Sequence, residues 1–179
     1  MIWFTGDEHF FHRNIIKYCN RPFKSHDDMK TTIIKRHNSL VKGDDLVYHI
    51  GDFAMIGSGQ ADKLKGILGQ LNGSHELILG NHDELKPQKY IDIGFQRVHT
   101  SLRLHLNDGY VIELHHDPSV YCLIESTLKE EFWRRTCIVH GHIHTLYRVM
   151  PDRRCINVGV DVNNFTPINF DTIKILLEL

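Results

Sequence analysis

The chain has 179 residues, a formal net charge of −1, an apolar share of 41% and a charged share of 24%. This length and apolar content fit one domain, residues 1–179, with a hydrophobic core of its own. The charge balance excludes a protein held on nucleic acid by a large basic surface, although it leaves room for a local basic groove.

The cysteines and the apolar runs indicate a cytoplasmic protein. Four cysteines are scattered without a CxxC pair, which is typical of reduced thiols in a cytosolic setting: Cys19, Cys122, Cys137 and Cys155. The opening MIWFTGDEHFFHRN lacks the pattern of a signal peptide. No apolar stretch approaches the roughly 20 residues that span a bilayer, so we expect no membrane partner.

The first half of the chain alternates predicted strands and helices. Short apolar runs predict strands over residues 2–5, 46–50 and 77–79. Ser25 and Asp28 have the spacing of a capping box, and apolar residues then recur at helical spacing to residue 40. A further helix is predicted over 61–71, where Asn72-Gly73 ends it.

The second half adds a predicted hairpin. Residues 102–106 and 110–114 flank Asn107-Asp108-Gly109, which is a turn signal. A helix is then predicted over 126–134, and strands over 137–139, 155–160 and 173–177. Strands that alternate with helices and give way to a hairpin predict an α/β sandwich of two mixed β-sheets flanked by helices.

Polar residues cluster directly after five of the predicted strands. Ligands in open α/β sheets bind beyond the carboxyl ends of strands, so we expect the five clusters to form one site. The chain is also rich in histidine, with 14 histidines against 13 glycines. The clusters are Asp7-Glu8-His9, Gly51-Asp52, Gly80-Asn81-His82-Asp83, His115-His116 and Gly141-His142-Ile143-His144.

These clusters offer the donors of a metal site. In an extended segment residues i and i+2 point the same way, so Asp7 and His9 can reach one ion, and so can His142 and His144. Further donors follow three other strands, namely Asp52, Asn81 and either His115 or His116. Nitrogen and oxygen donors without a thiolate suit Mn²⁺, Fe, Zn²⁺, Ni²⁺ or Co²⁺.

Each motif alone has an ordinary explanation. Asp-x-His is usually a chance match, Gly-Asp is more often a turn than a ligand, Gly-Asn-His-Asp can be an Asx turn, and Gly-His-x-His can be a surface loop. The order of the motifs, each after an apolar strand, favours one shared metal site over these separate explanations.

Together the five motifs resemble the calcineurin-like metallophosphoesterase superfamily across nearly the whole chain. The pattern of that superfamily is Asp-x-His, Gly-Asp, Gly-Asn-His-Asp/Glu, a His after a strand, and Gly-His-x-His. Asn157-Val158-Gly159 resembles the Asn-x-Gly that commonly closes its core. Residues 9–15 and 21–23 are similar to a compact bacterial and phage-type branch.

The resemblance implies two divalent ions, with Mn²⁺ favoured. The first ion would take Asp7, His9, Asp52 and His144, and the second would take Asp52, Asn81, His142 and one of His115 and His116. His116 is favoured because His116-Asp117-Pro118 is similar to wording found after this strand in related proteins. The implied reaction is hydrolysis of a phosphate mono- or diester by a hydroxide that bridges the ions.

The resemblance also implies roles beyond the metal ligands. His82 would be catalytic, either stabilising the phosphoryl oxygens or protonating the leaving group, although a supporting hydrogen bond is an alternative. His12 and Arg21 are candidates for substrate binding, and a surface arginine is an equal alternative for Arg21. His49 and His140 are expected to orient ligands or to lie in the core.

Two other functions stay open. One is a nuclease or nucleotide phosphodiesterase that acts on nucleic-acid ends, and the other is a catalytically silent metal-binding scaffold. The expected partner is a phosphate-ester substrate, with nucleotides and oligonucleotides among the candidates, and no obligate protein partner is inferred. Segments 10–25 and 117–126 are expected to set selectivity.

Overall fold

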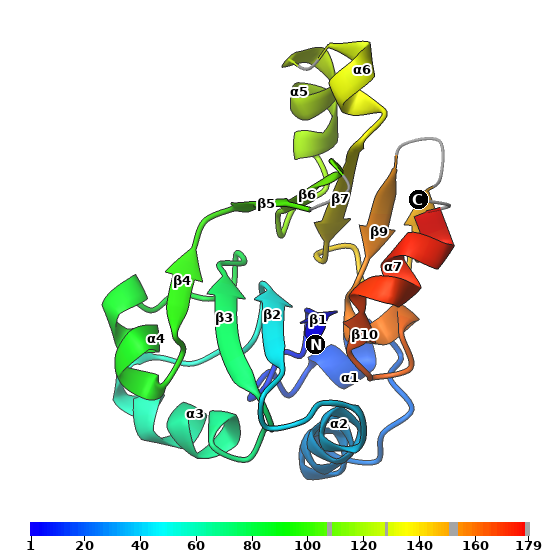
Figure 1. The fold of residues 1–179 in the computed structure, drawn as a ribbon. Coiled ribbons are helices and arrows are strands. Elements are labelled where there is room, and N and C mark those ends of the chain that lie inside the picture. Colours follow the sequence, from blue (N-terminus) through cyan, green and yellow to red (C-terminus); the bar gives the residue numbers. More distant parts are fainter. Residues whose placement is uncertain (107–108, 128, 151–153, 178–179) are drawn as a thin grey trace.

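The computed structural model contains two five-stranded sheets with helices around them (Figure 1). It describes residues 1–106, 109–127, 129–150 and 154–177. The strands are β1 (Ile2–Thr5), β2 (Leu46–Ile50), β3 (Ser74–Ile78), β4 (Arg97–His99), β5 (Leu102–His105), β6 (Val111–Leu114), β7 (Thr136–His140), β8 (Val149–Met150), β9 (Cys155–Asn157) and β10 (Ile168–Asn169). The helices are α1 (Ile15–Tyr18), α2 (His26–Leu40), α3 (Ala61–Leu68), α4 (Pro87–Ile93), α5 (Val120–Thr127), α6 (Glu130–Trp133) and α7 (Phe170–Leu177), with 3₁₀ turns η1 (Ser58–Gln60) and η3 (Val160–Val162). The predicted fold class, an α/β sandwich of two mixed sheets, is confirmed.

The first sheet has the strand order β10-β1-β2-β3-β4. Strands β1 to β4 are parallel, and β10 pairs with β1 in the antiparallel direction. The register places Ile2 opposite Leu46, and Leu46 opposite Ser74. The carboxyl ends of β1, β2 and β3 therefore lie side by side at one edge of the sheet, where ligands bind in open parallel sheets.

The second sheet has the strand order β5-β6-β7-β9-β8. Its inner strands β6, β7 and β9 are parallel, whereas β5 and β8 at the two edges are antiparallel to their neighbours. The predicted hairpin is present, with Leu102 opposite Leu114, and Asn107 and Asp108 of its turn lie outside the described residues. The carboxyl ends of β6 and β7 share one edge.

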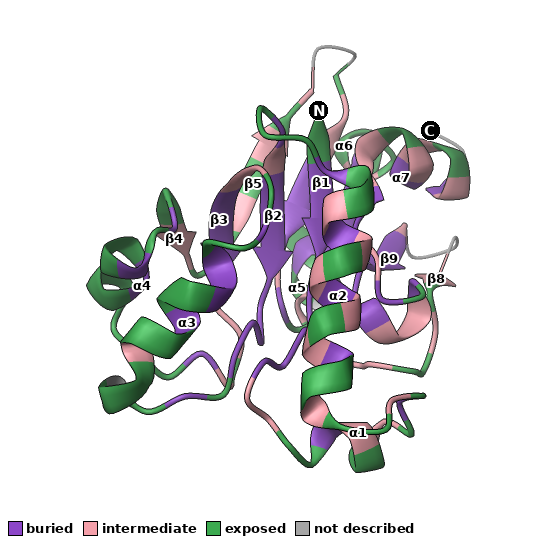
Figure 2. Cartoon of the chain, turned by 90° about the horizontal axis from the view of Figure 1, so that it is seen from below, coloured by how far each residue is buried: buried purple, intermediate pink, exposed green. Residues whose placement is uncertain are grey.

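Apolar side chains hold the layers together. One buried cluster joins the facing sides of the two sheets and includes Phe4, Ile50, Ile78, Leu114, Val139 and Ile156. A second cluster joins the other face of the first sheet to α2, α3 and α4, through Met29, Ile33, Leu64, Leu77 and Tyr90. Figure 2 shows the buried strands between helices whose outer faces are exposed. This packing fixes the edges that carry the polar clusters.

The helix predicted after Ser25 is α2. The Ser25 hydroxyl accepts a hydrogen bond from the Asp28 backbone N–H at 3.1 Å, which is the N-cap contact that the sequence predicts. The Asp28 carboxylate in turn accepts from the backbone N–H of Lys24 at 3.0 Å. Among the described residues, no helix has both the length and the apolar character required to cross a membrane.

The last predicted strand is wrong, because residues 173–177 belong to helix α7. The Asn169 side chain accepts a hydrogen bond from the Thr172 backbone N–H at 2.9 Å and so caps the helix start. Ile173 and Leu177, one helical turn apart, are both buried. A short apolar run cannot by itself separate a buried strand from a helix with this spacing.

Smaller differences concern element bounds. The helix predicted over 126–134 is replaced by α5 and α6, and the strand predicted over 155–160 ends at Asn157. The helix predicted over 61–71 ends at Leu68, and the strand predicted over 77–79 begins earlier, at Ser74. Boundaries of this kind depend on local hydrogen bonds that hydrophobic patterns do not encode.

Candidate metal centre

The polar loops of the two sheets bond directly to one another. The Asp7 N–H donates to the carbonyl of Gly51 at 3.0 Å, which joins the loops after β1 and β2. The Asp7 carboxylate accepts from the His142 N–H at 2.9 Å, and the Gly141 N–H donates to the His116 carbonyl at 3.1 Å. Asp7 therefore lies where the strand ends of both sheets meet.

Five of the predicted metal ligands have left-handed backbone conformations. Such a conformation costs a non-glycine residue roughly 1–2 kcal/mol, and it persists where surrounding structure enforces it, commonly at functional sites. The φ angles are 56° at Asp7, 53° at His9, 54° at Asp52, 73° at His142 and 47° at His144. The sequence-based expectation of extended i, i+2 pairs is therefore wrong, although sharp turns bring both pairs to the same place.

Glycines leave the room in which the carboxylates lie. A Cβ atom at Gly80 would overlap the carboxylate of Asp52, and one at Gly159 would lie 2.5 Å from Asp7 Oδ2. The Asn157 side chain fixes the loop that contains Gly159, since its Oδ1 accepts a hydrogen bond from the Gly159 N–H at 2.8 Å. The glycines of these motifs are therefore needed for close approach to the two carboxylates.

The first donor group consists of Asp7, His9 and His144. One ligand atom of each lies within 4.8 Å of those of the other two. His9 is 1% exposed, and neither of its ring nitrogens has a hydrogen-bond partner among the described residues. Buried polar atoms are nearly always paired, so an unpaired imidazole facing two other donors fits a bound cation.

Asp52 lies between the first donor group and a second one. Its Oδ2 atom is 3.4 Å from His9 Nε2 and also 3.4 Å from His116 Nε2. Asp52 is 2% exposed, and Asp7 is fully buried. Two carboxylates removed from water require a compensating positive charge, which a divalent cation would supply.

The second donor group consists of Asn81, His116 and His142, whose acceptor atoms face one another. Asn81 Oδ1 lies 3.1 Å from His116 Nε2 and 3.0 Å from His142 Nδ1, and these two ring nitrogens are 3.2 Å apart. His116 Nδ1 lies 2.9 Å from the Ile50 carbonyl and must donate its proton there, which leaves a lone pair on Nε2 in the neutral ring. Such an arrangement needs a proton or a cation between the atoms, so the residues fit a metal ion.

Of the two adjacent histidines, only His116 joins this group. His115 instead has its Nε2 3.8 Å from Glu113 Oε2. The ring of His116 is 6% exposed and packs against His142, with 5.0 Å between ring centroids. The geometry therefore favours His116 over His115 as the histidine that follows β6.

Comparison with known proteins gives a family. Uncharacterized protein MJ1445 of Methanocaldococcus jannaschii is 37% identical over 183 residues, which cover 99% of this chain and 91% of that protein. The chain belongs to the MJ1445 family. The gene 66 protein of Mycobacterium phage L5 is 30% identical over 187 residues, covering 89% of this chain and 86% of that protein.

A solved structure shares the fold of this MJ1445 family member. The protein of unknown function AQ665 from Aquifex aeolicus has a TM-score of 0.76 and 27% identity, and 98% of each chain is covered. The phosphopantetheinyl hydrolase PptH from Mycobacterium tuberculosis has a TM-score of 0.46 and 13% identity, a likeness too weak to carry an argument. No family model matches the chain.

Charges at the centre depend strongly on one another. Burial raises the pKa of Asp7 to about 6. Burial acts in the same direction on Asp52, but contact with His116 outweighs it and the pKa of Asp52 falls to about 2. Burial lowers the pKa of His116, but the Asp52 and Asp7 carboxylates outweigh it and the value rises to about 9. In the absence of metal a protonated imidazole thus balances the carboxylates, and metal binding would release that proton.

Asp83 and Asp161 support the donors, and sequence reasoning did not single out either role. Asp83 Oδ2 accepts from the N–H groups of Asp52 and Gly80, at 2.8 and 2.9 Å, and so holds two motif loops together. Asp161 Oδ2 lies 2.9 Å from His144 Nδ1, so Nε2 is the ring nitrogen that would bind a metal ion. The fourth residue of Gly-Asn-His-Asp signals Asp83, whereas no motif signals Asp161.

Arg21, a candidate for substrate binding, lies in a buried network within the protein. Its side chain is fully buried, and its guanidinium makes two hydrogen bonds of 2.8 Å to the carboxylate of Asp161. The remaining N–H groups donate to the carbonyls of Asp7 and Glu8 and to the sulfur of Met29. All five donors of the guanidinium are therefore used within the protein.

His82 and His12 lie beside His9 of the first donor group. The His82 backbone N–H donates to Asp52 Oδ1 at 2.8 Å, which fixes the residue beside the centre. The His82 ring is 5.3 Å from that of His9 and 5.8 Å from that of His12, between centroids. Both side chains are half-buried, so they can meet a ligand at the centre.

His49 and His140 are buried behind the donors, as expected. His49 Nδ1 is 2.7 Å from Glu8 Oε1, and its Nε2 is 3.1 Å from His75 Nδ1. His140 Nδ1 is 2.9 Å from the Gly141 carbonyl. Glu8, which the sequence motif contains without a role, thus links the loop after β1 to a buried histidine pair.

Proposed function

We propose that this chain is a calcineurin-like metallophosphoesterase that binds two divalent ions and hydrolyses phosphate mono- or diesters. The observation that carries the proposal is the position of Asp52, one oxygen of which lies 3.4 Å from donor nitrogens of two separate groups. A carboxylate shared between two sets of nitrogen and oxygen donors is suited to a pair of ions, with Mn²⁺ the favoured species.

The proposed ligands follow from the two donor groups. The first ion would be held by Asp7, His9, Asp52 and His144, and the second by Asp52, Asn81, His116 and His142. A pair of such ions lowers the pKa of bound water and clamps both ends of an in-line displacement at phosphorus. No serine or cysteine nucleophile is then required of the chain.

Side chains around the ions would supply a proton to the leaving group and orient the substrate and the ligands. His82 would donate a proton from its ring to the leaving oxygen, or hydrogen-bond the phosphoryl oxygens, from its position beside His9. His12, 5.8 Å from the His82 ring, would contact the same substrate. Asp161 and Asp83 would keep the His144 ring and the Asp52 loop in place.

The test is hydrolysis of two chromogenic esters by the purified chain with and without Mn²⁺. We expect release of nitrophenol from bis-p-nitrophenyl phosphate or p-nitrophenyl phosphate with Mn²⁺, and none after chelation by EDTA. The ratio of the two rates ranks diester against monoester. Tight Mn²⁺ binding without hydrolysis of these or other phosphate esters would instead indicate a silent metal-binding scaffold.

A further inference from the structure

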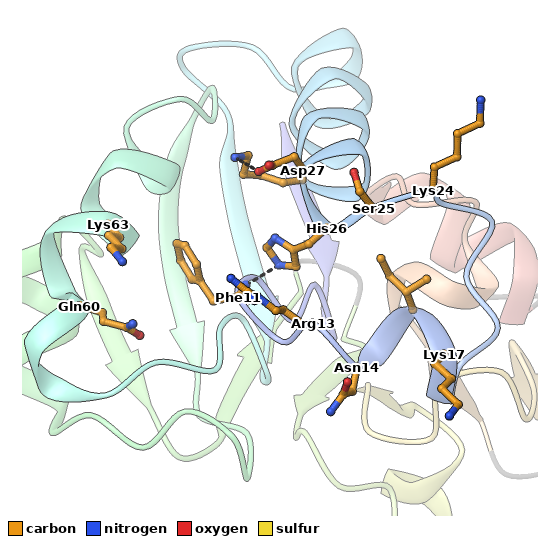
Figure 3. Close-up of a pocket in the computed structure, with 12 residues that line it drawn as sticks. Phe11, Arg13, Asn14, Lys17, Lys24, Ser25, His26, Asp27, Gln60 and Lys63 are labelled. Carbon is orange, nitrogen blue, oxygen red and sulfur yellow. Dashed lines mark hydrogen bonds and ion pairs between the residues drawn. The ribbon is translucent and has the colours of Figure 1, made fainter.

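A cavity of about 730 Å³ opens beside the segment that carries His9 and His12. Its lining begins at Phe11, two residues after His9, and includes the start of α1, the start of α2 and the region around η1 and α3 (Figure 3). Its volume falls within the range of about 300–1,000 Å³ typical of ligand sites. Part of the lining comes from segment 10–25, which the sequence predicts to set selectivity, and the rest comes from residues 26–30 and 60–63.

The lining of this cavity is strongly basic. Five cationic side chains line it against a single carboxylate, that of Asp27, and they are Arg13, Lys17, Lys24, Lys30 and Lys63. Lys30 Nζ is 2.7 Å from Asp27, whereas the other four cations make no ion pair with any described residue. Because the whole chain has a net charge of −1, this is a local concentration of positive charge.

The lining also contains an aromatic ring that is held in place. The Phe11 backbone N–H donates to His26 Nε2 at 2.8 Å, and the two rings are stacked with 6.1 Å between centroids. Figure 3 shows this contact, with Lys63 and Gln60 on one side and Arg13 and Asn14 on another. A fixed aromatic ring offers a stacking surface, and the two amides can hydrogen-bond the edges of bases.

We propose that this cavity binds single-stranded nucleic acid, with one phosphodiester at the metal centre and the adjoining phosphates against the cations. The inference rests on the proposed function and names the substrate class of that site. Cations that come from several elements and are spread around an open cavity suit a chain of phosphates better than a single phosphate group. A phosphodiester chain is also the polyanion that matches the chemistry proposed for the metal centre, and Phe11 and Arg13 of the lining flank His12 in the sequence.

Binding is tested in EDTA with a fluorescein-labelled oligothymidylate of eight nucleotides, so the result does not depend on hydrolysis. The test variant is the triple substitution Arg13→Gln, Lys24→Gln and Lys63→Gln. The matched control is Lys35→Gln, Lys42→Gln and Lys86→Gln, which removes the same charge from exposed positions outside the cavity. All six side chains are exposed, so both proteins are expected to fold, which circular dichroism checks.

We expect the test variant to bind at least about tenfold more weakly at 50 mM salt than the control variant. The slope of log K against log salt should also become about 2 units shallower, since each phosphate contact on a single strand contributes about 0.7. Equal affinity and equal slope in the two variants would overturn the proposal.

Competition identifies the class of anion. Unlabelled oligonucleotide should displace the probe at far lower concentration than polyglutamate or tripolyphosphate of equal total charge, and a duplex should compete less well than a single strand. Equal competition by polyglutamate would overturn the proposal in favour of an acidic protein. A chain that binds the probe through the cavity but hydrolyses no ester would refute the proposed function, and with it the role of nucleic acid as substrate, while nucleic-acid binding by the cavity would stand.

Discussion

In the proposed reaction, His82 would be the proton donor to the leaving group. Its backbone is tied to Asp52, so its ring is held beside the donors without belonging to either group. We expect His82→Ala to keep its metal and to lower kcat at least about 10²-fold, the usual size of a lost general acid. His105→Ala, an exposed histidine on β5, is the matched control and should keep full activity. An unchanged kcat in His82→Ala would remove this residue from the mechanism.

Arg21 illustrates a residue whose type suggests one role and whose surroundings give it another. Because its buried ion pair with Asp161 would lose one partner, we expect Arg21→Met to lower the free energy of unfolding by about 3–5 kcal/mol. Arg36→Met, at a partly exposed position on α2, should cost far less. Urea unfolding measures both. A variant that unfolds like the wild type but has lost phosphate-ester binding would restore the predicted substrate contact.

The proposed ligand residues were readable from the sequence, whereas several residues that support them were not. Asp-x-His, Gly-Asp and Gly-His-x-His mark donors because such motifs keep ligands adjacent in the chain. Asp161 meets His144 and Arg21 only after folding, and no local pattern reveals that contact. The residue types alone could not separate His115 from His116, which the resemblance favoured, because the difference lies in the contacts that each ring makes after folding.

At the scale of elements, the loops after the strands leave no room for a side chain at key glycines. We expect Gly80→Ala to displace Asp52 and to cost about 1–3 kcal/mol of stability together with metal affinity, since overpacking forces shifts of the surrounding structure. Gly66→Ala is the control, because nothing lies within 4 Å of its Cβ and it lies within helix α3. That control should gain up to about 1 kcal/mol. Equal metal affinity in the two variants would contradict the packing argument.

Helix α2 and strand β2 bury histidines that titrate on unfolding. Burial lowers the pKa of His37 to about 4, from 6.5 in the unfolded chain. The neutral folded form is therefore favoured, and its stability contribution is complete above pH 6.5 and is lost as the pH falls toward 4. The wild type should lose about 3 kcal/mol more than His37→Gln between pH 7.5 and 4. Parallel pH profiles from urea unfolding would show that His37 does not account for this loss.

The elements themselves were predictable where hydrophobic pattern and capping agree. Strands β1 and β2 and the start of α2 match the predictions, because clear apolar runs end in glycine clusters and Ser25 provides a cap. Residues 173–177 of helix α7 were predicted as a strand, since a short apolar run fits the spacing of a strand as well as that of a helix. The contact that decides for the helix is the cap formed by Asn169.

For the whole molecule, the centre lies where loops of the two sheets meet. Asp7 follows a strand of the first sheet and accepts hydrogen bonds from the loop of the second. Metal ions held by ligands from both sheets would bind the folded form alone and stabilise it. We expect Mn²⁺ to raise Tm and EDTA to reverse the change, with the response lost in Asp52→Ala. A Tm independent of Mn²⁺ at millimolar concentration would contradict a centre shared by the sheets.

Metal content tests the arrangement most directly. Chain loaded with Mn²⁺, freed of excess metal and analysed by plasma mass spectrometry should retain about two ions per wild-type molecule. Asp52→Ala should retain fewer than one, because it removes the carboxylate between the two donor groups. Wild-type protein without bound Mn²⁺ or another divalent transition metal, or an Asp52→Ala variant that keeps two ions, would contradict the dinuclear centre.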